Sequence, residues 1–214
     1  MIFNLSKTNS IANTFIAELR DESIQKDSMR FRKNLGRLGA FFAYEISKTL
    51  SYVEVDTQTP LGIAKSSVLA EQPVLATILR AGLPMQEGFL SVFDRADCAF
   101  ITAYRKTKKS GDFIIQMEHI SAPDLEDKTV ILADPMLATG LSMVLCAREL
   151  INRYRIKKLH IVAAIASSEG VKHVLANLPK ADLWLGAIDE EMTSKSYIVP
   201  GLGDAGDLAF GIKV

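Results

Sequence analysis

From residue 74 onwards, short apolar runs of strand length alternate with segments of helical periodicity, and this alternation limits the possible folds more than any other feature. The strand-like runs are unbroken and rich in β-branched residues, which is typical of strands covered on both faces. We predict strands at Val74–Leu79, Cys98–Tyr104, Val130–Ala133, Leu159–Ala166 and Leu183–Ile188, with helices at 83–93, 141–154 and 168–177. The pattern predicts an α/β fold with a mostly parallel sheet flanked by helices.

The N-terminal third of the chain has a helical pattern instead. Between residues 28 and 50 the apolar side chains recur every three or four positions, at Phe31, Leu35, Leu38, Phe42 and Ile46. This stripe is suited to packing against a larger element, and it is also a candidate interface between copies of the chain. Because the 214 residues contain no repeat, low-complexity tract or linker, we expect one domain over 1–214 with a helical elaboration at about 10–50.

Composition excludes several classes of partner. Lys and Arg total 25 and Asp and Glu total 25, so the chain has no overall field to hold nucleic acid or an acidic membrane surface. Any phosphate site must therefore be local. The chain has no apolar run that approaches a membrane span and no recognisable secretion signal, so we expect a cytoplasmic protein. Cys98 and Cys146 form no CxxC motif and are expected to be small buried residues.

The most informative loop follows the third predicted strand. The chain there reads DPMLATGLS (134–142) and continues as an apolar helix. A helix N-terminus presents unpaired N–H groups and the positive end of the helix dipole, so such a loop can hold a phosphate. Thr139 and Ser142 add hydroxyl donors, whereas the carboxylate of Asp134 repels phosphate and suits sugar hydroxyls. The loop has neither the GK[ST] of a Walker motif nor a GxGxxG sequence, and alone it fits a ribose phosphate site or an ordinary capped turn.

The wider sequence resembles one family. VILADPMLATGLS closely resembles the motif of the uracil phosphoribosyltransferases that binds phosphoribosyl pyrophosphate (PRPP), whose usual form contains DPMLATGGS. ILRAGLPM (78–85) is similar to the family's ILRAGLGM, and YIVPGLGDAGD (197–207) matches its uracil-binding segment without a change. Weaker similarity at RLGAFFAYEISKTL, TPLG, Tyr104-Arg105, SSEGVK and AIDEE extends the match, in the family's order, over nearly the whole chain.

This resemblance implies a type I phosphoribosyltransferase fold with a C-terminal hood that recognises the base. It also implies the reaction of uracil with PRPP to give UMP and pyrophosphate, a step of pyrimidine salvage. The implied catalytic residues are Asp134 at the ribose and Arg80 and Arg105 at the pyrophosphate, where a guanidinium makes multidentate contacts. The remaining PRPP contacts are expected at Pro135, Met136, Leu137, Ala138, Thr139, Gly140, Leu141 and Ser142.

The two arginines differ in how far the sequence alone supports a function. Arg80 directly follows a strand that we expect to be buried, and an unpaired buried arginine is costly, which favours a ligand role. Arg105 begins the polar stretch RKTKKSGD, which fits a solvated basic face equally well. The resemblance implies that the loop from Arg105 to about Asp112 closes over PRPP and excludes water.

The C-terminal segment is implied to recognise the base. Uracil presents an acceptor, a donor and an acceptor along one edge, and the family matches these with backbone groups at positions occupied here by Ile198, Gly203 and Ala205. Asp204 is expected beside both uracil and PRPP, acting through a metal-bound water. Without the resemblance, PGLGDAGD would fit a surface turn rich in Gly and Asp.

The implied reaction needs no protein nucleophile and no histidine. Mg2+ is expected to be held mainly by PRPP oxygens and water, so we assign no protein metal ligand. The expected substrates are uracil and PRPP, with no nucleic-acid or membrane partner, and the family resemblance favours a homodimer or higher homo-oligomer. Leu141, Pro84 and Leu208 depart from the family's pattern. The alternatives are a regulatory protein that binds UMP or PRPP without turnover, and a plain nucleotide-binding α/β module.

Overall fold

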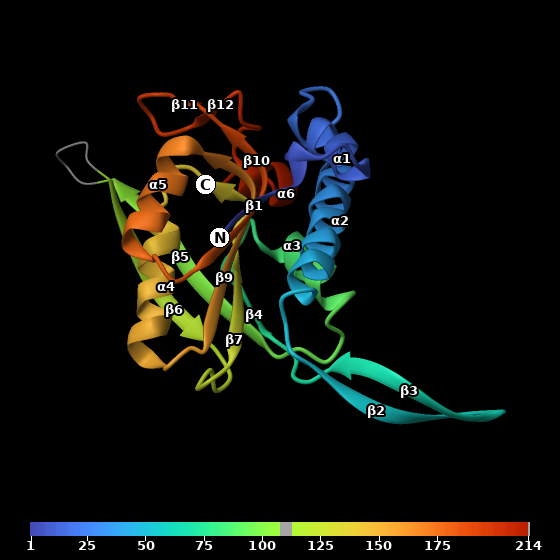
Figure 1. Cartoon of the computed structure of the whole chain (residues 1–214). Coiled ribbons are helices and arrows are strands. Elements are labelled where there is room, and N and C mark those ends of the chain that lie inside the picture. Colours follow the sequence, from blue (N-terminus) through green and yellow to red (C-terminus); the bar gives the residue numbers. More distant parts are fainter. Residues whose placement is uncertain (108–112, 214) are drawn as a thin grey trace.

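The computed structural model describes the backbone over residues 1–107 and 113–213 and the side chains over 1–103 and 117–213. Within this part, the main sheet has eight strands, seven of them in the order β1-β10-β9-β7-β4-β5-β6, with the short β8 pairing with β9 (Figure 1). Pairs are parallel except β5 with β6. The bounds are β1 Ile2–Asn4, β4 Val74–Leu79, β5 Cys98–Thr107, β6 Phe113–Ser121, β7 Thr129–Ala133, β8 Met136–Leu137, β9 Lys158–Ser167 and β10 Asp182–Asp189.

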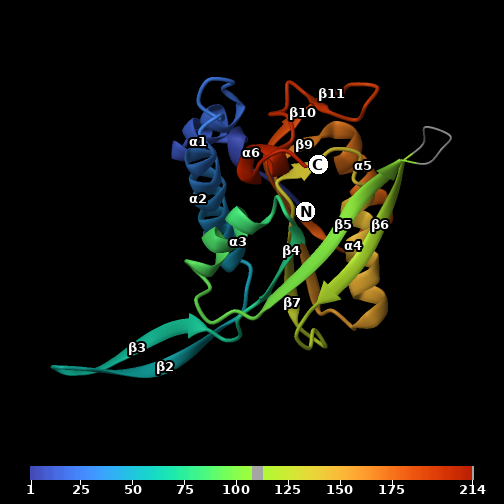
Figure 2. The ribbon, with the colours of Figure 1, turned by 180° about the vertical axis from the view of Figure 1, so that it is seen from behind.

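Helices cover both faces of this sheet, as the apolar runs predicted. The bounds are α1 Ile11–Arg20, α2 Ser28–Ser47, α3 Leu83–Leu90, α4 Leu141–Arg153, α5 Ser168–Asn177 and α6 Ala205–Phe210. Helices α1 to α3 lie on one face and α4 and α5 on the other (Figures 1 and 2). Along β4 the side chains alternate, because Leu75 joins the core under α2 and α3 while Val74 and Ala76 join the core under α4.

The apolar stripe of α2 lies inside the protein. Phe31 and its four partners in the stripe are each at most 1% exposed, and they pack in one cluster with Met85 and Phe89 of α3. The expectation that this stripe serves as an interface between copies was therefore wrong. It is the seam that joins the N-terminal helices to the sheet, because a helix gains most of its stability from burying such a face.

A long hairpin leaves the body of the protein, and the sequence analysis did not predict it. Strands β2 (Tyr52–Thr59) and β3 (Gly62–Leu69) pair antiparallel along their full length, from Tyr52 opposite Leu69 to Thr59 opposite Gly62. Both views show this hairpin extending away from the sheet and helices (Figures 1 and 2). We call residues 52–69 the β arm.

The sheet order reverses between β4 and β7, and we call the region outside the carboxyl ends of these two strands the crevice. From β4 the chain proceeds through α3 to β5 on one side, whereas from β7 it proceeds to β9 and β10 on the other. Ligands of open α/β sheets bind at such a reversal, outside the carboxyl ends of the strands. Arg80 follows β4 and Asp134 follows β7, so both stand at this point. None of the helices in the described part of the chain has the length and apolar character needed to cross a bilayer.

Candidate active site

The loop 134–142 joins β7 to α4 at the carboxyl edge of the sheet. Gly140, at the N-cap of α4, is left-handed with φ 77° and has no side chain to cap the helix. Residue 140 therefore leaves the backbone N–H groups of the first turn uncapped, and such groups can bind a ligand. The Thr139 hydroxyl accepts from the Leu141 N–H at 3.4 Å, and the Asp134 carboxylate accepts from the Met136 N–H at 3.3 Å. The loop and helix start are arranged as the sequence predicted.

Neighbouring elements hold this loop in place. Met136 and Leu137 form the short strand β8 beside β9, and the Ser167 hydroxyl donates to the Ala138 carbonyl at 2.6 Å. Gly170 lets α5 approach closely, because a Cβ there would lie 2.2 Å from the same carbonyl. Ser167 and Gly170 were missed as supporting residues, although they belong to the similarity noted at SSEGVK.

Leu141 takes an ordinary helical conformation. The position that needs glycine is 140, so replacement of the family's second glycine by leucine introduces no left-handed strain. Leu141 is 50% exposed, so it does not pack into the core beneath α4. Its side chain therefore does not turn toward the packing face of the helix.

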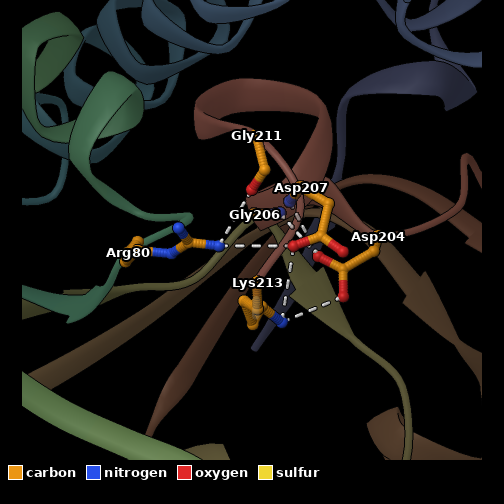
Figure 3. Close-up of polar contacts among 6 residues, drawn as sticks. All are labelled: Arg80, Asp204, Gly206, Asp207, Gly211 and Lys213. Atoms are coloured by element: carbon orange, nitrogen blue, oxygen red, sulfur yellow. Dashed lines mark hydrogen bonds and ion pairs between the residues drawn. The ribbon is translucent and has the colours of Figure 1, made fainter.

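Arg80 is not buried, in contrast to the reasoning from its neighbouring strand. Its side chain is 42% exposed, and its guanidinium donates to the Asp207 carboxylate and to the Gly211 carbonyl, each at 3.3 Å (Figure 3). The burial argument for a functional Arg80 therefore fails. Arg80 nevertheless lies at the crevice and contacts α6 and the C-terminal tail. These contacts bring the motif at 78–85 next to the end of the motif at 197–207.

Asp204 and Lys213 complete this charged cluster. Asp204 caps α6, because one carboxylate oxygen accepts from the N–H groups of Gly206 at 2.9 Å and Asp207 at 3.0 Å. The other oxygen lies 3.2 Å from the Lys213 ammonium, which lies 3.8 Å from Asp207 (Figure 3). Burial by itself would raise the pKa of Asp204, but these N–H donors and Lys213 outweigh it and lower that pKa. Lys213 was not singled out by the sequence analysis.

The other predicted base contacts lie in the same C-terminal segment. Ile198 is in β12 (Ile198–Val199), which pairs with β11 (Glu191–Met192), and its side chain is buried. Gly203 is left-handed with φ 94°, and Ala205 begins α6. The chain between them has no regular secondary structure, so its backbone groups are not all committed to a ladder.

Arg105 lies on the backbone of β5, but its side chain is outside the described residues. The proposed closing loop includes residues 108–112, which also lie outside them. Cys146 is fully buried, and burial raises the pKa of its thiol to about 12. His160 is 1% exposed, and its Nδ1 accepts from the Trp184 indole N–H at 3.0 Å, so it is a core residue with its hydrogen bond satisfied.

Comparison with solved structures supports the class suggested by this geometry. A hypoxanthine-guanine phosphoribosyltransferase of Bacillus anthracis has the same fold, with TM-score 0.51 and 14% identity, covering 76% of this chain and 82% of its own. A protein of Aquifex aeolicus has TM-score 0.88 and 30% identity, with both chains fully covered. The mostly parallel sheet, the switch-point crevice and the loop before α4 define a type I phosphoribosyltransferase fold.

Comparison with sequences gives the family. The family model described as "Uracil phosphoribosyltransferase" matches residues 6–212. A protein of that name from Porphyromonas gingivalis is 47% identical over 214 residues, covering 100% of this chain and 99% of the relative. Another from Thermococcus gammatolerans is 38% identical over 199 residues, covering 92% and 87%. The chain belongs to the uracil phosphoribosyltransferase family.

Proposed function

We propose that this protein transfers ribose 5-phosphate from PRPP to uracil, giving UMP and pyrophosphate. One structural observation carries the proposal beyond family membership. Arg80, which follows β4 at the crevice, is bonded to Asp207 of the base segment, which we define as residues 197–207. A Cβ added at Gly206 would lie 3.9 Å from the Arg80 guanidinium. A base held by this segment would therefore lie beside a group suited to pyrophosphate, as the transfer requires.

The loop 134–142 is the proposed site of the 5-phosphate and ribose. The first N–H groups of α4 and the hydroxyls of Thr139 and Ser142 are suited to the phosphate. The Asp134 carboxylate is suited to the ribose hydroxyls and to the positive charge that develops on the sugar ring as the pyrophosphate leaves. Displacement at the anomeric carbon then needs a held geometry and charge stabilisation, and no protein nucleophile.

Arg80 is proposed to bind the departing pyrophosphate, together with Arg105 from the neighbouring strand. The Arg80 contacts to Asp207 and Gly211 are 3.3 Å long and partly exposed, so they are weak enough for a pyrophosphate to replace. A guanidinium binds a phosphate group more strongly when the contact is bidentate.

We propose that Mg2+ enters with PRPP as part of the substrate. The described residues contain no group of three or more His, Cys, Asp or Glu side chains that could hold a metal ion. On the side of the crevice next to Arg80, the carboxylates are those of Asp204 and Asp207, which suits an outer contact through water. The ion would supply charge stabilisation for the leaving pyrophosphate.

The base segment is the proposed uracil site, through backbone groups of Ile198, Gly203 and Ala205 and with Asp204 alongside. Cytosine carries an amino group where uracil carries a carbonyl oxygen, so it would leave at least one buried backbone group unpaired. Such a mismatch costs about 1–3 kcal/mol per group.

The test is incubation of the purified protein with labelled uracil, PRPP and Mg2+, followed by chromatography for UMP. We expect UMP to form, to require the divalent cation, and to be accompanied by an equal amount of pyrophosphate. Cytosine in place of uracil should give little product. Tight UMP binding without turnover would contradict this proposal and support the regulatory alternative.

We also propose that the protein is a homodimer or higher homo-oligomer, through the β arm. Its tip and edges expose apolar side chains, including Leu61 at 99% and Ile63 at 68%. An isolated two-stranded hairpin is marginally stable in water, so another surface must cover it. A second copy of this neutral chain is the proposed occupant.

Light scattering coupled to size exclusion tests this assembly. We expect a mass of at least twice 23.5 kDa, and a lower mass for the double variant Leu61→Ser/Ile63→Ser. Met29→Ser, which changes an exposed apolar residue outside the arm, is the control and should not alter the mass. A monomeric parent protein at micromolar concentration would refute the assembly.

We further propose one domain over 1–214 and a cytoplasmic location, where the highly charged PRPP need not cross a bilayer.

A further inference from the structure

One ion pair joins the end of α1 to the end of β10, at the base segment. The Arg20 guanidinium and the Asp189 carboxylate make two parallel hydrogen bonds, each 2.7 Å long. The side chains are 21% and 7% exposed, so both charges are largely removed from water. A bidentate, buried pair of this kind has a fixed geometry, unlike the exposed ion pairs elsewhere on the protein.

Both members of the pair also bind the same residue. The Gly201 N–H donates to the Asp189 carboxylate at 2.9 Å, and the Gly201 carbonyl accepts from the Arg20 guanidinium at 2.9 Å. Gly201 is left-handed with φ 56°, and a Cβ there would lie 2.2 Å from the Ile198 carbonyl. The pair therefore fixes the backbone groups on both sides of the Gly201 Cα in one orientation.

Gly201 lies at the centre of the base segment, between Ile198 and the contacts proposed at Gly203 and Ala205. Residues 200–204 have no regular secondary structure, so no ladder of backbone bonds fixes their conformation. Recognition of a base by backbone groups needs those groups placed to within a fraction of an ångström. An anchor supplied by side chains from α1 and β10 can provide this precision.

We infer that Arg20 and Asp189 are positioning residues for the nucleobase, acting through Gly201 rather than by touching the base. The inference rests on the proposed function for the identity of the base. It assigns a role to the end of α1, more than 160 residues away in sequence, in deciding which base is accepted.

The experiment compares Arg20→Lys and Asp189→Asn with the parent protein. Lysine keeps the charge but cannot make the paired bonds, and asparagine keeps the shape but not the charge. Arg30→Lys is a matched control, because Arg30 makes a similar two-bond pair with Glu18 between α1 and α2. Measurements are KM for uracil, KM for PRPP, kcat, and hydrogen exchange of the peptide covering 198–204.

We expect both variants to raise KM for uracil by about 10–100-fold, a range typical of misplaced contacts, with KM for PRPP changed less than about threefold. Exchange in 198–204 should become faster, and Arg30→Lys should change neither quantity. Equal changes in both KM values, or unchanged exchange in 198–204, would overturn the inference and leave the pair a general stabiliser.

The parent protein separates this inference from the proposed function. If it makes no UMP from uracil and PRPP, the proposed function fails, while hydrogen exchange in 198–204 still decides whether the pair anchors the segment. If Arg20→Lys does not fold, Asp189→Asn carries the same comparison.

Discussion

Substituting Gly140 by alanine tests the geometry of the loop 134–142 most directly. The left-handed conformation at φ 77° costs a residue with a Cβ about 1–2 kcal/mol. The new Cβ would also lie 3.0 Å from the Gly170 carbonyl and 3.2 Å from a methyl of Val174, so α5 or the loop must shift by a few tenths of an ångström. Alanine also lowers the chain entropy of the unfolded state, and this offsets about 0.5–1 kcal/mol of the cost in the free energy of unfolding.

We expect a net loss of about 1–2 kcal/mol in the free energy of unfolding. For a chain of 214 residues this corresponds to a decrease in melting temperature of roughly 2–8 °C. The displaced loop should raise KM for PRPP at least tenfold, because the N–H groups at the start of α4 would no longer point together at the phosphate. Differential scanning fluorimetry and initial rates at varied PRPP measure the two effects.

Leu141→Gly is the matched comparison, one residue further on. Leu141 is helical and half exposed, so glycine there should cost about 0.5–1 kcal/mol of helix stability, plus the packing of the buried half of the side chain. Its KM for PRPP should stay within a few-fold of the parent value, since the loop conformation does not depend on it. If Leu141→Gly binds PRPP a hundredfold tighter while Gly140→Ala binds normally, the reasoning is refuted and Leu141 obstructs the site.

Three further predictions concern single side chains. Asp134→Asn should lower kcat/KM about 10²–10³-fold with an unchanged melting temperature, and near-normal kinetics would show that the carboxylate is misassigned. Burial lowers the pKa of His160 from its ordinary 6.5 to about 4, so this residue contributes stability above pH 6.5 that is lost as the pH falls toward 4. The loss in the free energy of unfolding is on the order of 3 kcal/mol. Denaturant titrations should show a weaker pH dependence of that free energy for His160→Asn, whose side-chain oxygen can still accept from Trp184. Cys146 should react with maleimide only after unfolding, because its buried thiol has a pKa of about 12. Labelling of Cys146 in native buffer, distinguished from that of the partly buried Cys98 by peptide mass mapping, would contradict this.

The central fold was predictable because its signals are local. The unbroken apolar runs at Val74–Leu79 and Val130–Ala133 became β4 and β7 within one residue at each end. The β arm was missed although Val53 and Val55 alternate with acidic residues before the turn at TPLG. All of β2 is exposed except its last residue, which is partly buried, so no buried face distinguished it from a polar connection.

The site was predictable only as separate motifs, because its contacts join distant parts of the chain. The loop 134–142 and its helix follow from adjacent residues. The bond from Arg80 to Asp207 spans 127 positions, and that from Arg20 to Asp189 spans 169. No periodicity or spacing specifies such pairs. The wrong expectation for Arg80 has the same origin, since a buried strand determines the environment of its own residues and not of the residue that follows.

If Arg80 binds pyrophosphate as proposed, the charged cluster around it offers an anionic substrate a local cation on a chain with no net charge. Two cations, Arg80 and Lys213, face two carboxylates, Asp204 and Asp207, so the cluster is balanced without a ligand. Asp204 is committed to capping α6, whereas the Arg80 contacts are long and exposed. A pyrophosphate that arrives with its metal ion can therefore take over Arg80 while the cap of α6 stays in place. Under the proposed function, the base segment would keep its shape as the other substrate binds beside it, and Asp204 would serve that segment as the cap of α6.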